Sequence, residues 1–382
     1  MSHESTVVAG GATDFMTVRH LRLTGGQQEI GRALGGEATG YGWAPTPIDP
    51  VLGRARRVWF ERHWPQHAER LRGIAEAAGV DPDRDDLAFD SPSSVPAGSG
   101  CSAVFCPPSS TVDGHGLFGR NYDFFTMSWE EMVAAFSGPD GTPAAPGGTP
   151  IASRPYVLTT VPDDGLATTV ITMDNLDGAT EGVNEAGLSV ALLISDITEA
   201  KPPEGPTPPQ VGVNPMQLPR FVLETCRTAD EAKAALLGAK QSAEVGCHYL
   251  IADASGRAFV WERAGGVEHI IEAEGGGPLC VTNHLLSRHP VARDLPADTE
   301  ETFLTYGRAR TLTERVEGAE VGRDFLEDAM DEVSVPAAPD FPWRTLWRSV
   351  IDVNEPSLET RFYLGDADGA VRRSEALRFT PK

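Results

Sequence analysis

The stretch from residue 100 to residue 124 contains GCSAVFC (100–106), a polar turn at DGHG (113–116) and LFGRNYDF (117–124). Two short β-rich runs joined through an Asp-Gly turn are typical of a β-hairpin. The hairpin follows SPSSVPAGSG (91–100), a run of small and turn-forming residues that marks a boundary in the chain. Cys101 is therefore predicted to begin a strand directly after a loop.

The chain before this boundary has a mainly helical pattern. Residues 16–25 predict a strand, and a helix is expected to start near Gln27 after the turn at Gly25 and Gly26. Apolar residues recur at helical spacing from 55 to 78, and Pro65 predicts a break between two helices. Residues 1–100 are thus expected to form a mainly helical N-terminal segment.

The chain after the boundary, residues 101–382, is rich in short strands. The predicted strands are TTVITMD (168–174), LSVALLIS (188–195), HYLIAD (248–253), AFVWE (258–262), HIIEA (269–273) and RFYLG (361–365). Helical patterns interrupt them at 218–238 and 300–316, and Pro/Gly-rich loops are expected at 138–150 and 201–215. These elements predict an α+β architecture of stacked sheets with helices outside.

Charge and cysteine content narrow the classes of function. The 382 residues include 32 Lys and Arg against 55 Asp and Glu, a net charge of −23, which disfavours binding to nucleic acid or an anionic membrane. No signal peptide and no membrane-spanning apolar run is recognised, so we expect a cytoplasmic protein without a membrane partner. Five scattered cysteines lack metal-ligand spacing, and we predict neither a metal nor a cofactor.

Cys101 has two interpretations. Most free cysteines are small buried apolar residues, and an Arg120–Asp123 ion pair on the returning strand could simply close the hairpin. The alternative is a nucleophile, with a cation and a carboxylate placed beside it by the hairpin. Cys106, five residues further along the strand, is expected to face the opposite side and to belong to the core.

The motifs around and beyond the hairpin resemble those of the linear-amide hydrolases of the N-terminal-nucleophile (Ntn) superfamily. This group contains choloylglycine hydrolases, penicillin V acylases and isopenicillin N acyltransferases. The matching motifs, in order, are GCSAVF (100–105), DGHGLFGRNYDF (113–124), EGVNEAGLSV (181–190), YLIADASG to WE (249–262) and VTNH (281–284). The N-terminal segment resembles that of the acyltransferase branch, so the resemblance covers nearly the whole chain.

This resemblance implies a four-layer αββα sandwich and autocatalytic cleavage between Gly100 and Cys101. The two products, residues 1–100 and 101–382, are expected to stay associated. Cys101 would then be both nucleophile and new N-terminus, and its free α-amine, with an ordinary pKa of about 7.7–8.0, would be the general base. The implied catalytic set is Cys101, Arg120, Asp123, Asn283 and Arg308.

Each of the other members of this set has an implied role. Arg120 would favour the thiolate, Asp123 would accept a hydrogen bond from the Cys101 amine, and Asn283 would stabilise the oxyanion. Arg308 would support the site, although Arg310 matches the pattern almost as well. At residues 194–196 the sequence Ile-Ser-Asp departs from choloylglycine hydrolases, which leaves the second oxyanion donor open.

Three functions remain open at this point. The first is an autoprocessed amidohydrolase that cleaves a small N-acyl or aminoacyl substrate through a thioester. The second is an acyltransferase that passes the acyl group from an amide or thioester donor to an amine. The third is an unprocessed, inactive homologue that acts by binding. The substrate is a small molecule in the first two, and a homo-oligomer remains an open alternative.

Overall fold

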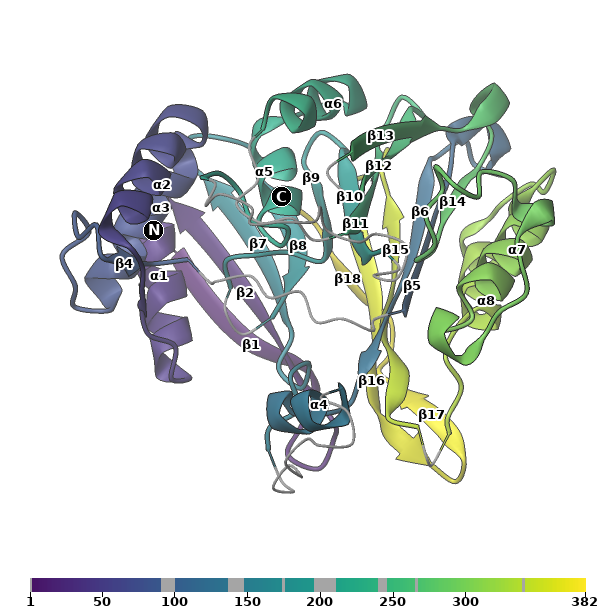
Figure 1. Ribbon diagram of the computed structural model, residues 1–382, viewed down its shortest axis with the longest axis horizontal. Helices are drawn as coiled ribbons and strands as arrows, with labels where there is room; N and C mark the ends of the chain where they lie inside the picture. The colour runs from purple at the N-terminus through teal and green to yellow at the C-terminus, as the bar shows by residue number, and fades with distance from the viewer. Residues whose placement is uncertain are drawn as a thin grey trace.

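The computed structural model describes residues 2–90, 100–136, 148–173, 176–195, 211–239, 246–264, 267–338 and 341–382. These residues include a nine-stranded sheet and a seven-stranded sheet that pack face to face (Figure 1). In the nine-stranded sheet only the β2–β7 pair is parallel. Its strands, in spatial order, are β1 (Ser2–Gly10), β2 (Thr17–Gly25), β7 (Tyr156–Pro162), β8 (Thr168–Thr172), β9 (Glu181–Asn184), β10 (Ser189–Ile194), β11 (Cys247–Ala252), β12 (Ala258–Ala264) and β13 (Val267–Glu272).

The seven-stranded sheet contains the predicted hairpin. Its spatial order is β14 (Leu279–Val281), β5 (Gly100–Cys106), β6 (Leu117–Phe125), β15 (Trp343–Asp352), β16 (Ser357–Ala367) and β17 (Ala370–Arg373), with β18 (Leu377–Phe379) also paired to β16. The hairpin strands β5 and β6 lie near the middle of this sheet and are buried along their whole length.

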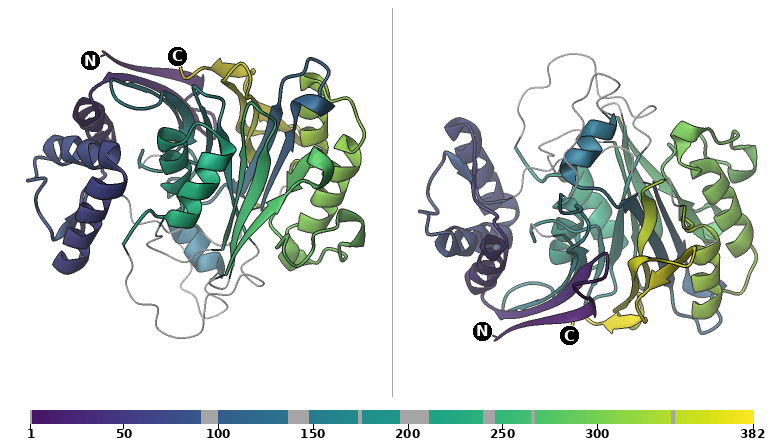
Figure 2. Two further views of the ribbon diagram at one scale, coloured as in Figure 1. Left: turned by 90° about the horizontal axis from the view of Figure 1, so that it is seen from above. Right: turned by 90° about the horizontal axis from the view of Figure 1, so that it is seen from below.

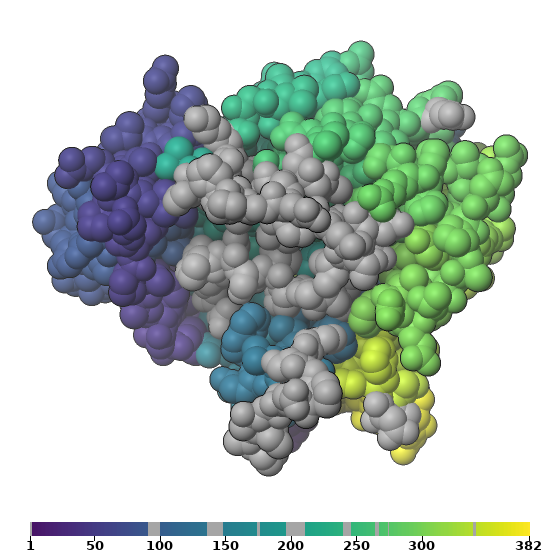
Figure 3. All heavy atoms as spheres, in the orientation of Figure 1, coloured from purple at the N-terminus to yellow at the C-terminus, as the bar shows by residue number. Residues whose placement is uncertain are grey.

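Helices cover the outer faces of both sheets, so the fold has four layers in the order αββα (Figure 2). The nine-stranded sheet is covered by α1 (Gln27–Gly40), α2 (Pro50–His63), α3 (Pro65–Ala77), α5 (Leu218–Thr225) and α6 (Ala229–Gly238). The seven-stranded sheet is covered by α7 (Thr305–Val316) and α8 (Arg323–Glu332). Figure 3 shows the N-terminal helices and the α7–α8 region on opposite sides of the molecule. No described helix is long and apolar enough to cross a bilayer.

Most elements expected from the sequence are present. The helices break at Pro65 as predicted, and Gly79 ends α3 with a φ of +68°, in the left-handed region that glycine tolerates. The N-terminal segment also contributes strands β1 and β2 to the large sheet. Strand β1 was not predicted because its first six residues are exposed, so no apolar face is visible in the sequence.

The elements that were missed include α4 (Trp129–Phe136), α8, β7, β15, β17 and β18. Strand β15 is buried on both faces yet contains two arginines, which hides the apolar run expected of a central strand. Of the predicted Pro/Gly-rich loops, residues 138–147 and 201–210 lie outside the described residues.

The alternation of β5 decides where the candidate nucleophile points. Cys101, Ala103 and Phe105 belong to the core between the two sheets. Val104 and Cys106 belong to the separate core under α7 and α8. The prediction that Cys106 faces away from Cys101 is therefore confirmed, as strand geometry requires.

Candidate active site

The candidate nucleophile lies at the start of β5, in the middle of the protein. The side chain of Cys101 is 1% exposed. The β5–β6 register places Gly100 opposite Asp123, Cys101 opposite Tyr122 and Ala103 opposite Arg120. The hairpin predicted from the sequence thus brings the Arg and the Asp of the returning strand beside the cysteine.

Arg120 approaches the Cys101 thiol from the space between the sheets. Its side chain is completely buried and contacts the thiol, while its Nη2 donates to the carbonyl of Leu192 on β10 at 2.6 Å. The Arg120 Nε lies 3.1 Å from Oε2 of Glu181 on β9, an ion pair in which the N–H is not aligned for a hydrogen bond. Glu181 therefore compensates the buried charge that faces the sulfur.

Glu181 is itself fixed by the opposite sheet. Its Oε1 accepts hydrogen bonds from Trp347 Nε1 at 2.6 Å and from Ser349 Oγ at 2.9 Å, both on β15. The Trp347 ring stacks on Tyr122 at 4.0 Å between centroids, within 2° of parallel. Strands from both sheets thereby hold Arg120 against Cys101, which limits the positions that its guanidinium can take.

Arg308, on α7, reaches the same residue from the other side of the sheet. Its Nη1 donates to the backbone carbonyl of Cys101 at 2.6 Å and to Ser102 Oγ at 2.9 Å, and it lies 3.4 Å from Oδ2 of Asp123. Its Nη2 donates to Asn283 Oδ1 at 2.8 Å. Arg310 instead donates to the carbonyls of two residues, 295 and 296, away from the site. Of the two arginines that matched the pattern, Arg308 is the one at the cysteine.

Asn283 and Asp123 complete the set, and their contacts differ from those expected. In the continuous strand the Cys101 N–H donates to Asn283 Oδ1 at 2.8 Å, and the Asn283 amide donates to the carbonyl of Ile194 at 2.6 Å. The Asp123 carboxylate accepts from Thr345 Oγ1 at 2.6 Å and faces Arg308. The Cys101 nitrogen thus meets the Asn283 oxygen rather than the Asp123 carboxylate.

Burial dominates the electrostatics of the site. Burial raises the pKa of the Cys101 thiol, and Arg120 offsets part of that rise. Burial also raises the pKa of Asp123 to about 6, against the opposing effects of Arg308 and the hydrogen bond from Thr345. Burial by itself would lower the pKa of Arg120, but Cys101 and Glu181 raise it. In the continuous chain the thiol is therefore held in its neutral form near pH 7.

The structure thus brings Cys101, Arg120, Asp123, Asn283 and Arg308 together from β5, β6, α7 and the loop after β14. Sequence reasoning missed Glu181 and Thr345. Glu181 begins the EGVNEAGLSV motif, so a search for the carboxylate that a buried arginine requires would have found it. Thr345 lies on β15, a strand that the sequence did not predict, and had no such signal.

Groups able to hold a metal do not occur around Cys101 in the part of the chain that the structure describes. The one group of ligand-type side chains found there, His67, Asp90 and Asp177, lies elsewhere. The chemistry available at Cys101 is therefore that of a thiol with two fixed cations, two carboxylates and an amide.

Comparison with known proteins gives a family match. The model of the family described as acyl-coenzyme A:6-aminopenicillanic acid acyl-transferase matches residues 110–362. No curated protein matches the sequence.

Three solved structures are similar to the chain. Penicillin V acylase from Agrobacterium tumefaciens has 17% identity and a TM-score of 0.47, over 69% of this chain and 83% of that one. A variant of conjugated bile acid hydrolase from Clostridium perfringens has 14% identity and a TM-score of 0.46, over 73% and 96%. An N-acylethanolamine-hydrolyzing acid amidase ortholog from Caenorhabditis elegans has 14% identity and a TM-score of 0.37, over 66% and 93%.

Proposed function

Since the chain belongs to the acyl-coenzyme A:6-aminopenicillanic acid acyl-transferase family, and so to the Ntn amide hydrolases and acyltransferases, we propose that it is a precursor that cleaves itself between Gly100 and Cys101. The mature enzyme then uses the Cys101 thiol to attack a linear amide of a small N-acyl or aminoacyl substrate. The observation that carries the proposal is the convergence of Arg120, Arg308 and Asn283 on one buried cysteine.

The cleavage step follows from the position of the thiol in its strand. The Cys101 sulfur attacks the carbonyl carbon of Gly100, and the bond to the Cys101 nitrogen breaks to give a thioester and a free amine. Water then hydrolyses the thioester, which leaves a Gly100 carboxylate and the thiol. Arg308 already binds the carbonyl of Cys101 at 2.6 Å, so the strand stays anchored when the bond before it is cut.

The freed amine supplies the base that the uncleaved chain lacks. Its ordinary pKa of about 7.7–8.0 lets it take the thiol proton and return it to the leaving amine. Asn283 Oδ1, which accepts from the same nitrogen at 2.8 Å, is placed to orient this amine. Arg120 stabilises the resulting thiolate, because its guanidinium is charged at any pH of interest and contacts the sulfur.

The acyl-enzyme is the branch point between two outcomes. Water resolves the thioester in a hydrolase, and a second amine resolves it in an acyltransferase. The family match to an acyl-transferase favours testing the second outcome alongside the first. Supplying the processed protein with amide and acyl-thioester donors, with and without an amine acceptor, separates hydrolysis from aminolysis by the products.

Intact-mass spectrometry tests the processing step directly. The expected species are residues 1–100 and 101–382, which remain together on gel filtration. Cys101→Ala is expected to give one full-length chain, whereas Cys106→Ala, a matched change five residues along β5, is expected to process. A full-length wild type without amide-cleaving activity would refute the proposal and leave a binding protein.

A further inference from the structure

His67, Asp90 and Asp177 form a buried cluster that takes no part in the Cys101 site. His67 lies on α3, Asp90 follows β4 (Leu87–Ala88), and Asp177 lies between β8 and β9. Their relative exposures are 0%, 3% and 5%, and one ligand-type atom from each lies within 4.8 Å of the other two. Two of the three residues belong to the N-terminal segment and one to the body of the protein.

The imidazole of His67 is held between aromatic rings without a hydrogen bond to either nitrogen among the described residues. Its ring stacks on Trp64 at 4.1 Å and meets the edge of Phe60 at 4.8 Å between centroids. Among the described residues, neither ring nitrogen has a hydrogen-bond partner. The Nε2 atom points at the Asp177 carboxylate, 3.6 Å from Oδ1. Burying an imidazole without a hydrogen bond to either nitrogen costs free energy, and a ligand bound to one of these nitrogens would offset that cost.

The two carboxylates are oriented by a neutral amide. Gln217 Nε2 donates to Oδ2 of Asp90 and to Oδ2 of Asp177, at 2.7 Å in each case. Gln217 Oε1 accepts from the backbone N–H of Asn214 at 3.0 Å, which fixes the direction of the amide. Hydrogen bonds of this kind to the outer oxygens are typical of the groups that orient metal ligands.

Nearby arginines pair with only one of the two carboxylates. Arg56 makes an ion pair with Asp90, while Arg70 and Arg220 both direct their guanidinium groups at Glu224, at 2.8 and 2.9 Å. No described arginine or lysine makes an ion pair with the Asp177 carboxylate, whose hydrogen bond comes from the neutral Gln217. The Asp177 carboxylate and the His67 imidazole therefore lie side by side without a direct ion pair to a described arginine or lysine, while Arg220 and Arg70 act on Asp177 only electrostatically.

We propose that His67, Asp90 and Asp177 bind a divalent transition-metal ion that fastens the N-terminal segment to the body of the protein. One imidazole nitrogen and two carboxylate oxygens suit Zn²⁺ or Mn²⁺ rather than Ca²⁺ or Mg²⁺. The proposal departs from the sequence-based expectation of no metal, because residues 67, 90 and 177 have no ligand spacing along the chain.

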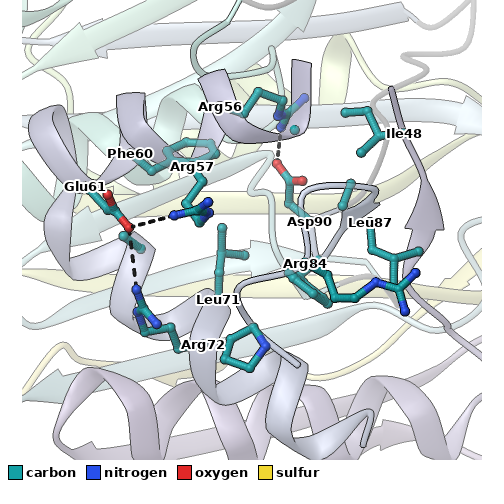
Figure 4. A pocket seen from close by; sticks show the side chains of 15 residues that line it. Ile48, Arg56, Arg57, Phe60, Glu61, Leu71, Arg72, Arg84, Leu87 and Asp90 are labelled. Carbon is teal, nitrogen blue, oxygen red and sulfur yellow. Dashed lines mark hydrogen bonds and ion pairs between the residues drawn. The ribbon is translucent and has the colours of Figure 1, made fainter. Parts of the chain in front are cut away.

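A pocket reaches one member of the cluster on the side of the N-terminal segment. Asp90 lines a pocket between α2, α3 and the pair formed by β3 (Thr46–Pro47) and β4, next to Arg56, Phe60 and Leu71 (Figure 4). In Figure 4 the Asp90 carboxylate lies beside the Arg56 guanidinium at the edge of this pocket. Of the three proposed ligands, Asp90 is the one that lines this pocket.

Metal binding by the purified, tag-free protein tests the proposal without any measurement of catalysis. Protein stripped with EDTA is titrated with Zn²⁺ by calorimetry and with Co²⁺ by visible absorption. One equivalent of each ion is expected, with d–d bands for Co²⁺. At 100 times the dissociation constant, Zn²⁺ is expected to raise Tm by about 3 °C.

Matched variants locate the site. His67→Gln and Asp177→Asn are expected to weaken Zn²⁺ binding at least tenfold, whereas His63→Gln, at an exposed histidine four residues earlier, is expected to leave it unchanged. Absence of stoichiometric binding to the wild type overturns the proposal, and so does equal binding by the variants of residues 63 and 67. If the two cluster variants fail to fold, the wild-type titrations still decide.

Discussion

Replacing Glu181 by Gln is expected to destabilise the protein strongly although the change is nearly isosteric. Glu181 and Arg120 are both completely buried, and their ion pair spans 3.1 Å. Removing one member of a buried pair leaves an uncompensated charge, which costs about 3–5 kcal/mol. For a chain of this length, with an unfolding entropy of about 2.1 cal/mol/K per residue, that loss corresponds to a fall in Tm of roughly 4–6 °C.

Glu185→Gln is the matched control, four residues further along the same motif. Glu185 is 36% exposed, and its partner Arg227 lies 3.5 Å away and is 60% exposed. Exposed pairs of this kind contribute about 0–1 kcal/mol, so Tm is expected to change by 1 °C or less. Differential scanning calorimetry measures both variants. A Glu181→Gln protein that melts within about 1 °C of the control would refute the argument that the Glu181 charge compensates buried Arg120.

Three further changes have expected outcomes. Glu224→Gln removes the buried carboxylate that Arg70 binds at 2.8 Å across the two parts of the chain, and calorimetry should show a fall in Tm of roughly 4–6 °C. The hydrogen bond with Asp352 raises the pKa of His115 in the folded protein. The contact therefore stabilises the fold at a pH below the pKa of an unfolded histidine, and this stabilisation is lost as the pH rises through the pKa of folded His115. His115→Gln should lower Tm at pH 6 and leave it unchanged at pH 9. At Gly100 an added Cβ would overlap a neighbouring indole ring. Gly100→Ala should therefore slow cleavage of the precursor, measured by the time course of its two fragments on denaturing gels. A cleavage rate equal to that of the wild type would show that the strand adapts.

Much of the candidate site was accessible from the sequence because it depends on local geometry. Two β-rich runs joined by one loop predicted that the strand after Cys101 would return beside it, which is the arrangement of β5 and β6. The resemblance assigned Arg120 and Asp123 to the site, and the β5–β6 register places Arg120 opposite Ala103 and Asp123 opposite Gly100. The order of the downstream motifs also led to the correct fold class and family.

Other members of the site depended on packing between distant segments. Arg308 and Arg310 are two residues apart on one helix, so they project to nearly opposite sides. Only the packing of α7 against β5 makes Arg308 the one at the cysteine. Glu181 likewise meets Arg120 across the interface between the two sheets. The spacing of these two residues in the sequence does not predict this contact.

The sequence by itself determined the hairpin, the cysteine at its start, the alternation that separates Cys101 from Cys106, and the family. Each of these follows from neighbours within one or two strands or from motif order. Tertiary structure alone decided which arginine supports the cysteine, which carboxylate compensates Arg120, and that three buried side chains meet near α3. The physical reason is that such contacts join segments far apart in the chain, and their positions are set by the packing of whole layers.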